Sequence, residues 1–118
     1  ADNPAMHIVS PTFPHLEKQV VTLLQGVKCK THVLTGADKK WPAFAAMNRA
    51  IATSGTVGLE LAVAGVPHVI AYKAHPLTAY LVRRKAKVKY AHLASIVLDR
   101  PVVPEFIQEQ CTAEAIAK

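Results

Sequence analysis

Short apolar runs typical of strands alternate along this chain with longer runs whose apolar residues have helical spacing. The predicted strands cover residues 6–9, 30–34, 50–53 and 68–72, and the predicted helices cover about 15–25, 41–48, 57–64 and 76–85. Parallel strands need a crossover connection, which a helix commonly supplies, so this alternation is typical of a parallel sheet. We therefore predict an α/β fold, a Rossmann-like parallel sheet with helices on both faces.

After residue 88 the pattern is less regular, and we expect a helix that starts near Glu105 and a helical run over 112–118. A chain of 118 residues is long enough for one domain with a real core, so residues 1–118 are predicted to form a single domain. Because the chain lacks an initiating Met and its last helix looks cut short, we expect it to be a fragment of a larger protein.

Composition excludes several classes of protein. The chain is 51% hydrophobic and 19% charged, which favours a globular domain over a disordered one. Lys, Arg, His or Pro interrupts every apolar run before about 18 residues, so no transmembrane helix is predicted. Cys29 and Cys111 form no CxxC pair and are expected to be free thiols in a reducing cytoplasm. The histidines lack ligand spacing, so no metal site is expected.

The net charge of +6 and the pI near 9.6 favour an anionic partner. Nucleic acid is not expected, because aromatic residues make up only 6% and no nucleic-acid motif is present. Part of the positive charge gathers in a basic cluster, which consists of Arg83, Arg84, Lys85, Lys87 and Lys89. Such a cluster is either a solvated helix end, where cations are favourable, or a surface that binds phosphate groups or an anionic membrane.

The strongest candidate for a ligand site is the turn formed by Ser54, Gly55 and Thr56, between a predicted strand and a predicted helix. Such a turn presents unpaired backbone N–H groups and the positive end of a helix dipole, which suit a phosphate or diphosphate. Ser and Thr are also ordinary N-cap residues, so the turn alone does not distinguish a ligand site from a cap. Gly58 favours the ligand, because it leaves the first helical turn bare for a close approach.

Glu60 lies one helical turn later among apolar neighbours, so we expect a mostly buried helix in which this lone carboxylate has a hydrogen-bonding role. It could reach the sugar hydroxyls of a nucleotide held at the turn; the alternative is an ordinary exposed glutamate. The segment 72–78 follows a predicted strand and opens a helix at Pro76. Its polar side chains either line the same sheet edge as Ser54 or form a plain surface loop.

Five motifs together resemble a known family. In chain order they read ATSGTVGLE, AGVP, YKAHPLT, RRKAKVKY and DRPVVPEFIQE. The series resembles the C-terminal part of bacterial lipid-A-disaccharide synthase, closely over about residues 50–111 and more loosely over 6–34. Ser-Gly-Thr with a following Glu is only moderately specific, whereas its combination with PLT, KVKY and RPVVPE is much more specific.

The resemblance implies the C-terminal, donor-binding half of an inverting GT-B glycosyltransferase. Such enzymes transfer 2,3-diacylglucosamine from UDP-2,3-diacylglucosamine to 2,3-diacylglucosamine 1-phosphate, which yields the β-1,6-linked lipid A disaccharide and UDP. They need no metal or other cofactor. They work in the cytoplasm, peripheral to the inner membrane of Gram-negative bacteria.

Carried over by position, the resemblance implies roles for individual residues. Ser54, Gly55 and Thr56 would hold the diphosphate, and Glu60 would bind the ribose hydroxyls. The donor site would further be lined by Tyr72, Pro76, Leu77 and Thr78. Arg83, Arg84 and Lys87 would meet anionic groups or the membrane surface. Ser95 stands where the family usually has an Asn, so the role of that Asn at the donor site would fall to Ser95, whose shorter hydroxyl can make fewer hydrogen bonds.

The catalytic residues are expected in an N-terminal domain that this sequence lacks. Because group transfer needs both substrates in register, the chain alone is predicted not to turn over. It is also expected to self-associate if its sheet edges and apolar surface are normally covered. Two alternatives remain: another UDP-sugar enzyme of GT-B type, such as a peptidoglycan N-acetylglucosaminyltransferase or a UDP-sugar epimerase, and a non-catalytic nucleotide-binding module.

Overall fold

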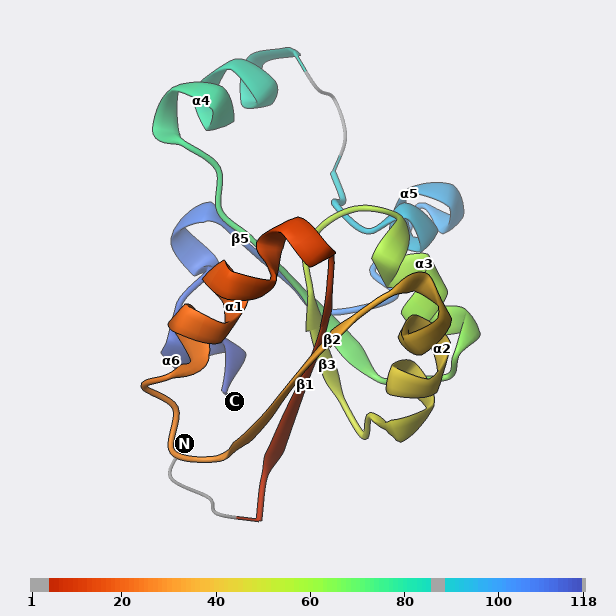
Figure 1. The fold of residues 1–118 in the computed structure, drawn as a ribbon. Helices are drawn as coiled ribbons and strands as arrows, with labels where there is room; N and C mark the ends of the chain where they lie inside the picture. Colours follow the sequence, from red (N-terminus) through yellow and green to blue (C-terminus); the bar gives the residue numbers. More distant parts are fainter. Residues whose placement is uncertain (1–4, 86–88, 118) are drawn as a thin grey trace. The chain divides into compact units, whose positions relative to one another are not determined.

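The computed structural model describes residues 5–85 and 89–117, and of residues 82–85 it describes the backbone alone (Figure 1). Contacts between residues divide the chain into two compact units. Unit 1 extends to Met47 and unit 2 starts at Asn48. Each unit is an α/β structure with a parallel sheet flanked by helices, which confirms the predicted Rossmann-like fold class. The single domain over residues 1–118 stays a prediction.

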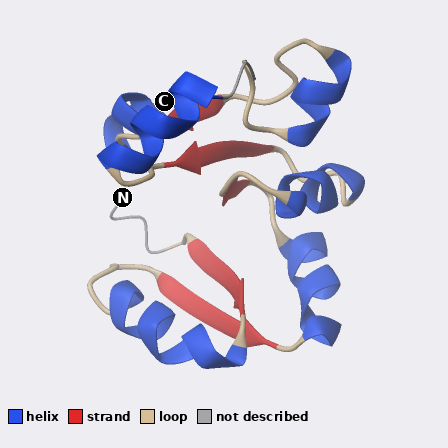
Figure 2. Ribbon diagram, turned by 90° about the horizontal axis from the view of Figure 1, so that it is seen from above, coloured by secondary structure: helices blue, strands red, loops and turns tan. Residues whose placement is uncertain are grey.

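Unit 1 is a parallel pair of strands with helical crossovers. Its elements are β1 (His7–Thr12), the 3-10 helix η1 (Pro14–Leu16), α1 (Glu17–Leu24), β2 (Lys30–Thr35) and α2 (Ala37–Ala46). The two strands pair from His7 opposite Lys30 to Thr12 opposite Thr35. Both α-helices contact this sheet (Figure 2). The buried core of the unit includes Phe44, whose ring meets the Trp41 ring edge-on at 5.7 Å.

The second helix of unit 1 starts one turn before the predicted range 41–48. Its first turn is polar and contains Asp38, so apolar spacing did not reveal it. Pro42 lies inside this helix, where its missing N–H removes one main-chain hydrogen bond. The helix is retained because Ala43 and Phe44, which follow the proline, are buried.

Unit 2 is built on a three-stranded parallel sheet. Its elements are β3 (Ala50–Ala52), α3 (Thr56–Val63), β4 (His68–Tyr72), α4 (Pro76–Lys85), α5 (Leu93–Leu98), β5 (Glu105–Ile107), the 3-10 helix η2 (Gln108–Gln110) and α6 (Ala113–Ile116). The strand order is β3-β4-β5, with Ala50 opposite His68 and Ile70 opposite Glu105. Ile70 on the central strand is fully buried, and Leu61 and Val66 are also buried in the core.

The helix predicted from Glu105 is wrong, because Glu105–Ile107 forms strand β5. The segment is a strand because it pairs in parallel with β4, and beside this pairing Ile70 N donates to Pro104 O at 2.9 Å. Three residues are too few for any periodic signal to show in the sequence. The predicted helical run over 112–118 is observed as the shorter α6, which is capped by Thr112.

Helix α5 was missed in the sequence because its six residues carry no clear apolar spacing. It begins after His92, whose side chain accepts a hydrogen bond from Ala94 N, and it ends at Asp99 in the left-handed conformation. No helix within the described ranges is long and apolar enough to cross a membrane.

Candidate functional site

The turn between β3 and α3 forms a side-chain hydrogen bond to a distant residue and has no side-chain N-cap. Gly55 has φ 141°, a conformation that favours glycine, and it occupies the N-cap position of α3 without a side-chain cap. Ser54 is exposed, and its Oγ donates to the carbonyl oxygen of Ala91 at 2.8 Å. Ser54 is therefore not an ordinary N-cap residue, and α3 starts at Thr56 without a side-chain cap on its first N–H groups.

Gly58 has a different role from the predicted one of admitting a ligand. A Cβ built at this position would lie 2.7 Å from both Cδ2 and Nε2 of His92, and 3.4 Å from Cδ1 of Ile70. The bare backbone of α3 is therefore occupied by the His92 ring, which is itself buried. That expectation about Gly58 is wrong, and the reason is internal packing between α3 and the residue that precedes α5.

Helix α3 is less buried than its apolar sequence predicts. Only Gly58 and Leu61 are buried, whereas Val63 is 80% exposed and Leu59 is 37% exposed. Glu60 is half-buried and has an interaction partner within the chain. The argument that Glu60 is a lone carboxylate in a mostly buried helix is therefore wrong, and its contact with a ribose stays a prediction.

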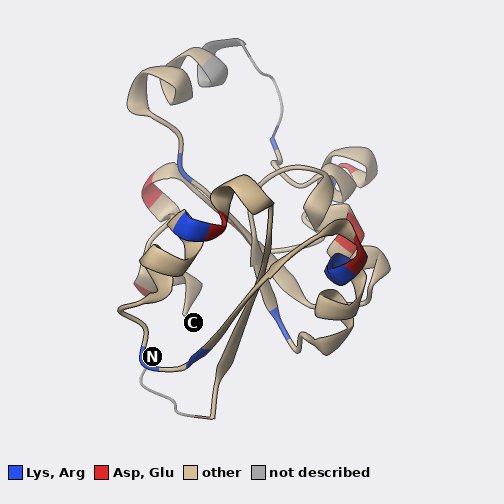
Figure 3. Ribbon diagram, viewed as in Figure 1, with Lys and Arg blue, Asp and Glu red and all other residues tan. Residues whose placement is uncertain are grey.

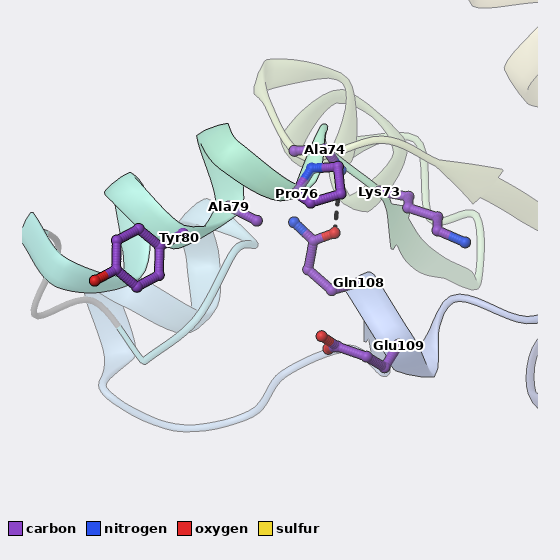
Figure 4. Close-up of a pocket in the computed structure, with 7 residues that line it drawn as sticks. All are labelled: Lys73, Ala74, Pro76, Ala79, Tyr80, Gln108 and Glu109. Atoms are coloured by element: carbon purple, nitrogen blue, oxygen red, sulfur yellow. Dashed lines mark hydrogen bonds between the residues drawn. The ribbon is translucent and has the colours of Figure 1, made fainter.

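A second feature lies where β4 and β5 end. It is a pocket of about 290 Å³, lined by Lys73, Ala74, Pro76, Ala79, Tyr80, Gln108 and Glu109 (Figure 4). Its volume is at the lower end for small-molecule sites. Gln108 spans the pocket wall, because its Oε1 accepts a hydrogen bond from Ala74 N at 3.3 Å. The lining residues carry an ammonium, a carboxylate, an amide and a phenol beside the apolar Pro76 and Ala79, and the Lys73 side chain points away from Gln108 (Figure 4).

Sequence reasoning found only part of this pocket. Pro76 lines it, whereas Tyr72 and Thr78 are exposed nearby in the chain but do not line it; a donor contact of these three residues stays a prediction. The contribution of Gln108 was missed because it depends on β5, which brings the residue beside the end of β4. A sequence signal was present in the polar run after Phe-Ile, but it needed the strand assignment to be useful.

The turn and the pocket belong to one edge of the unit 2 sheet. The Ser54 turn follows β3, and Lys73 follows β4, its parallel neighbour. Carboxyl ends of parallel strands meet at one edge, which is where α/β folds bind ligands. The Ser54 turn and the end of β4 therefore lie at the sheet edge where a ligand site is expected, and ligand binding by the predicted residues stays a prediction.

Ser95, by contrast, is fully buried. Its Oγ accepts a hydrogen bond from Val102 N at 3.2 Å, and its carbonyl oxygen accepts one from Arg100 N at 3.3 Å. The hydroxyl therefore holds the loop after α5, and its contact with a donor substrate stays a prediction.

The predicted basic cluster lies largely outside the described residues. Arg83 and Arg84 are on α4, but their side chains are not described, and Lys87 lies outside the described ranges. The charged residues that are described are dispersed over the helices, strands and loops of each unit (Figure 3). Cys29 and Cys111 are free thiols. Among the residues with described side chains, no group of three His, Cys, Asp or Glu is arranged to hold a metal ion.

Comparison with known proteins shows which family this chain is similar to. The family model described as lipid-A-disaccharide synthetase matches residues 1–118. A lipid-A-disaccharide synthase of Rhodospirillum centenum is 45% identical over 114 residues, which cover 97% of this chain and 28% of the relative. One of Rhodopseudomonas palustris (strain BisB18) is 43% identical over 117 residues, covering 99% of this chain and 30% of the relative.

A more distant organism carries a similar segment. A probable mitochondrial lipid-A-disaccharide synthase of Arabidopsis thaliana is 45% identical over 78 residues, which cover 66% of this chain and 17% of the relative. The chain thus spans roughly three tenths of the length of the bacterial relatives described above, 28% and 30% in the two cases.

Proposed function

Because the chain belongs to the lipid-A-disaccharide synthetase family, we propose that it is the donor-binding part of a lipid-A-disaccharide synthase. The family match over residues 1–118 carries this proposal. The geometry agrees with it, since a turn with open helix N–H groups and a polar pocket share one edge of a parallel sheet.

In this proposal the diphosphate of UDP-2,3-diacylglucosamine lies at the start of α3. The first backbone N–H groups of the helix and the Thr56 hydroxyl donate to its oxygens. Glu60, one turn further, accepts hydrogen bonds from the ribose hydroxyls. The pocket behind Pro76 holds another polar part of the donor, with Lys73 as a cation that complements its negative charge.

The proposed reaction is an inverting displacement. The 6-hydroxyl of 2,3-diacylglucosamine 1-phosphate attacks the anomeric carbon of the donor, the new C–O bond forms, and the bond to the UDP oxygen breaks. The hydroxyl proton passes to a base in the rest of the protein, and the electron pair leaves on UDP. The positive end of α3 stabilises the charge that develops on the leaving diphosphate.

We further propose that the enzyme works in the cytoplasm as a peripheral protein of the inner membrane. Helix α4 exposes Leu77, Tyr80 and Leu81 at 64%, 57% and 50% of their surface, and the basic cluster follows them in the sequence. Apolar side chains beside several cations are the two features that bind an anionic bilayer surface.

A segment exchange tests the proposed function. Residues 1–118 of this chain replace the matching segment of the Rhodospirillum centenum protein, and formation of lipid A disaccharide is measured from purified donor and acceptor. We expect turnover by the chimera and none by the 118-residue chain alone. In the chimera, Glu60→Ala raises the KM for the donor about tenfold or more, as expected for a lost charge-assisted hydrogen bond.

Two outcomes contradict the proposal. If the 118-residue chain binds UDP but a folded chimera forms no disaccharide, the chain is a nucleotide-binding module without the proposed role. If ATP binds the chain as tightly as UDP in calorimetric titrations, the assignment of a uridine donor is wrong.

A further inference from the structure

The two residues that precede α5, Ala91 and His92, are held by side chains from distant parts of unit 2. Ser54 Oγ donates to the Ala91 carbonyl oxygen at 2.8 Å. On the opposite side of the peptide, Glu105 Oε2 accepts from Ala91 N at 2.7 Å and Glu105 Oε1 accepts from His92 N at 3.0 Å. The carboxylate of β5 and the turn after β3 are therefore joined through this one dipeptide.

The His92 ring anchors the same dipeptide in the core. Its Nδ1 accepts a hydrogen bond from Ala94 N at 3.2 Å, so the proton of the neutral ring is on Nε2. That Nε2 lies 3.2 Å from Nε2 of His68, whose Nδ1 lies 2.9 Å from the Val66 carbonyl oxygen. One proton order satisfies all four ring nitrogens: His92 donates to His68, and His68 donates to Val66.

The hydroxyl of Ser54 has a single proton, which it gives to the Ala91 carbonyl. It cannot donate the same proton to a phosphate. This observation separates Ser54 from the backbone N–H groups of α3, which the turn leaves open.

We propose that Ser54 and Glu105 are positioning residues. Both form hydrogen bonds to the Ala91–His92 dipeptide, and these bonds fix the position of the Ser54–Thr56 turn. This inference rests on the proposed function where it concerns UDP, because the turn is the proposed diphosphate site. The donor is then held by main-chain N–H groups, and the geometry of those groups depends on a carboxylate that never touches the ligand.

A double-mutant cycle on the 118-residue chain tests this. UDP affinity is measured calorimetrically for the unmodified chain, Ser54→Ala, Glu105→Gln and the double variant, with Glu114→Gln on exposed α6 as the matched control. We expect each single variant to weaken UDP binding about tenfold and the double variant to do no worse, because both break one connection. If the double variant loses about a hundredfold, the two effects add, the residues act independently and the proposal is wrong.

A readout without ligand separates this inference from the proposed function. In amide NMR spectra, Glu105→Gln should shift the Thr56 and Val57 signals, although residue 105 is far away in the sequence, and Glu114→Gln should not. If the Thr56 and Val57 signals do not change, the inference is wrong, regardless of the result for UDP affinity. If the unmodified chain does not bind UDP, the proposed function fails, and these signals still decide the positioning role. Glu105→Asp, which keeps the charge, replaces Glu105→Gln in the same comparison if the amide variant does not fold.

Discussion

The His92 ring lies where a side chain on residue 58 would have to be, since a Cβ built on Gly58 comes within 2.7 Å of Cδ2 and Nε2 of His92. The contact joins α3 to the segment before α5 in the interior of unit 2, where His92 is only 1% exposed. A buried ring held through both nitrogens cannot turn aside in the way that the end of a flexible side chain can. Close packing between Gly58 and His92 therefore limits which side chains unit 2 tolerates at residue 58, near the start of α3.

Gly58→Ala should destabilise the chain. Alanine favours a helix over glycine by about 1 kcal/mol, but the overlap with His92 should outweigh this and leave a net loss of about 1–3 kcal/mol. Urea unfolding followed by circular dichroism measures the change. Gly26→Ala is the control, because a Cβ there meets nothing within 4 Å. Equal stability of the two variants would contradict the packing role of His92.

Gly55→Ala should harm both stability and ligand binding. At φ 141° an alanine is strained by about 1–3 kcal/mol, and relief of this strain moves the start of α3, so UDP affinity should fall about tenfold. Gly65→Ala is the matched control, since Gly65 also has a positive φ, 71°, but lies after α3. It should lower the melting temperature without changing the dissociation constant for UDP. Equal loss of UDP affinity in both variants would rule out a local role for Gly55.

His92→Ala should be far more harmful than His32→Ala. Both histidines have another histidine nitrogen at 3.2 Å, but the His68–His92 pair is buried and the His7–His32 pair is exposed. Removal of His92 leaves a cavity, an uncapped Ala94 N–H and an unpaired His68 nitrogen, for a loss of about 2–4 kcal/mol. His32→Ala should stay within about 0.5 kcal/mol. Chemical denaturation of both variants under one condition gives the comparison, and similar losses would refute it.

Lys73→Ala should weaken donor binding without unfolding the chain. Lys73 is exposed and lines the pocket, so loss of its charge-assisted contact should raise the dissociation constant for a UDP-sugar about tenfold. The difference should shrink in 0.5 M salt, where the Debye length is shorter than about 8 Å. Lys39→Ala on α2 is the control and should bind as the unmodified chain does. A Lys73 variant with unchanged affinity at low salt would remove the pocket from the donor site.

The strands and helices were predicted best where the apolar pattern in the sequence extended over a longer run of residues. Strands near 30–34 and 68–72 and helices near 57–64 and 76–85 are all observed within a residue or two of the predicted ends. The turn at Ser54 was found because Ser-Gly-Thr stands between a strand and a helix. The α2 start was missed because its first turn is polar, and α5 was missed because it is only six residues long.

The candidate site was harder to predict than the fold. The Ser54 turn and the segment 72–78, which contains Lys73 and Pro76, were singled out from local sequence, but Tyr80, Gln108 and Glu109 were not. Their place in a pocket depends on which strand lies next to β4, and a single sequence contains no direct sign of that neighbour. The prediction that Gly58 admits a ligand was wrong for the same reason. The space beside Gly58 is filled by the ring of His92, which lies 34 residues later in the chain.

By itself, the sequence determined the α/β class, the strand-turn-helix unit at Ser54 and the family, because these rest on local periodicity and ordered motifs. Only the tertiary structure decided that Glu105 belongs to a strand, that Ser54 donates to Ala91, and that His92 fills the space at Gly58. Each of these depends on contacts between residues far apart in the chain. Such contacts exist only after the sheet has formed, when pairing with β4 outweighs local preference.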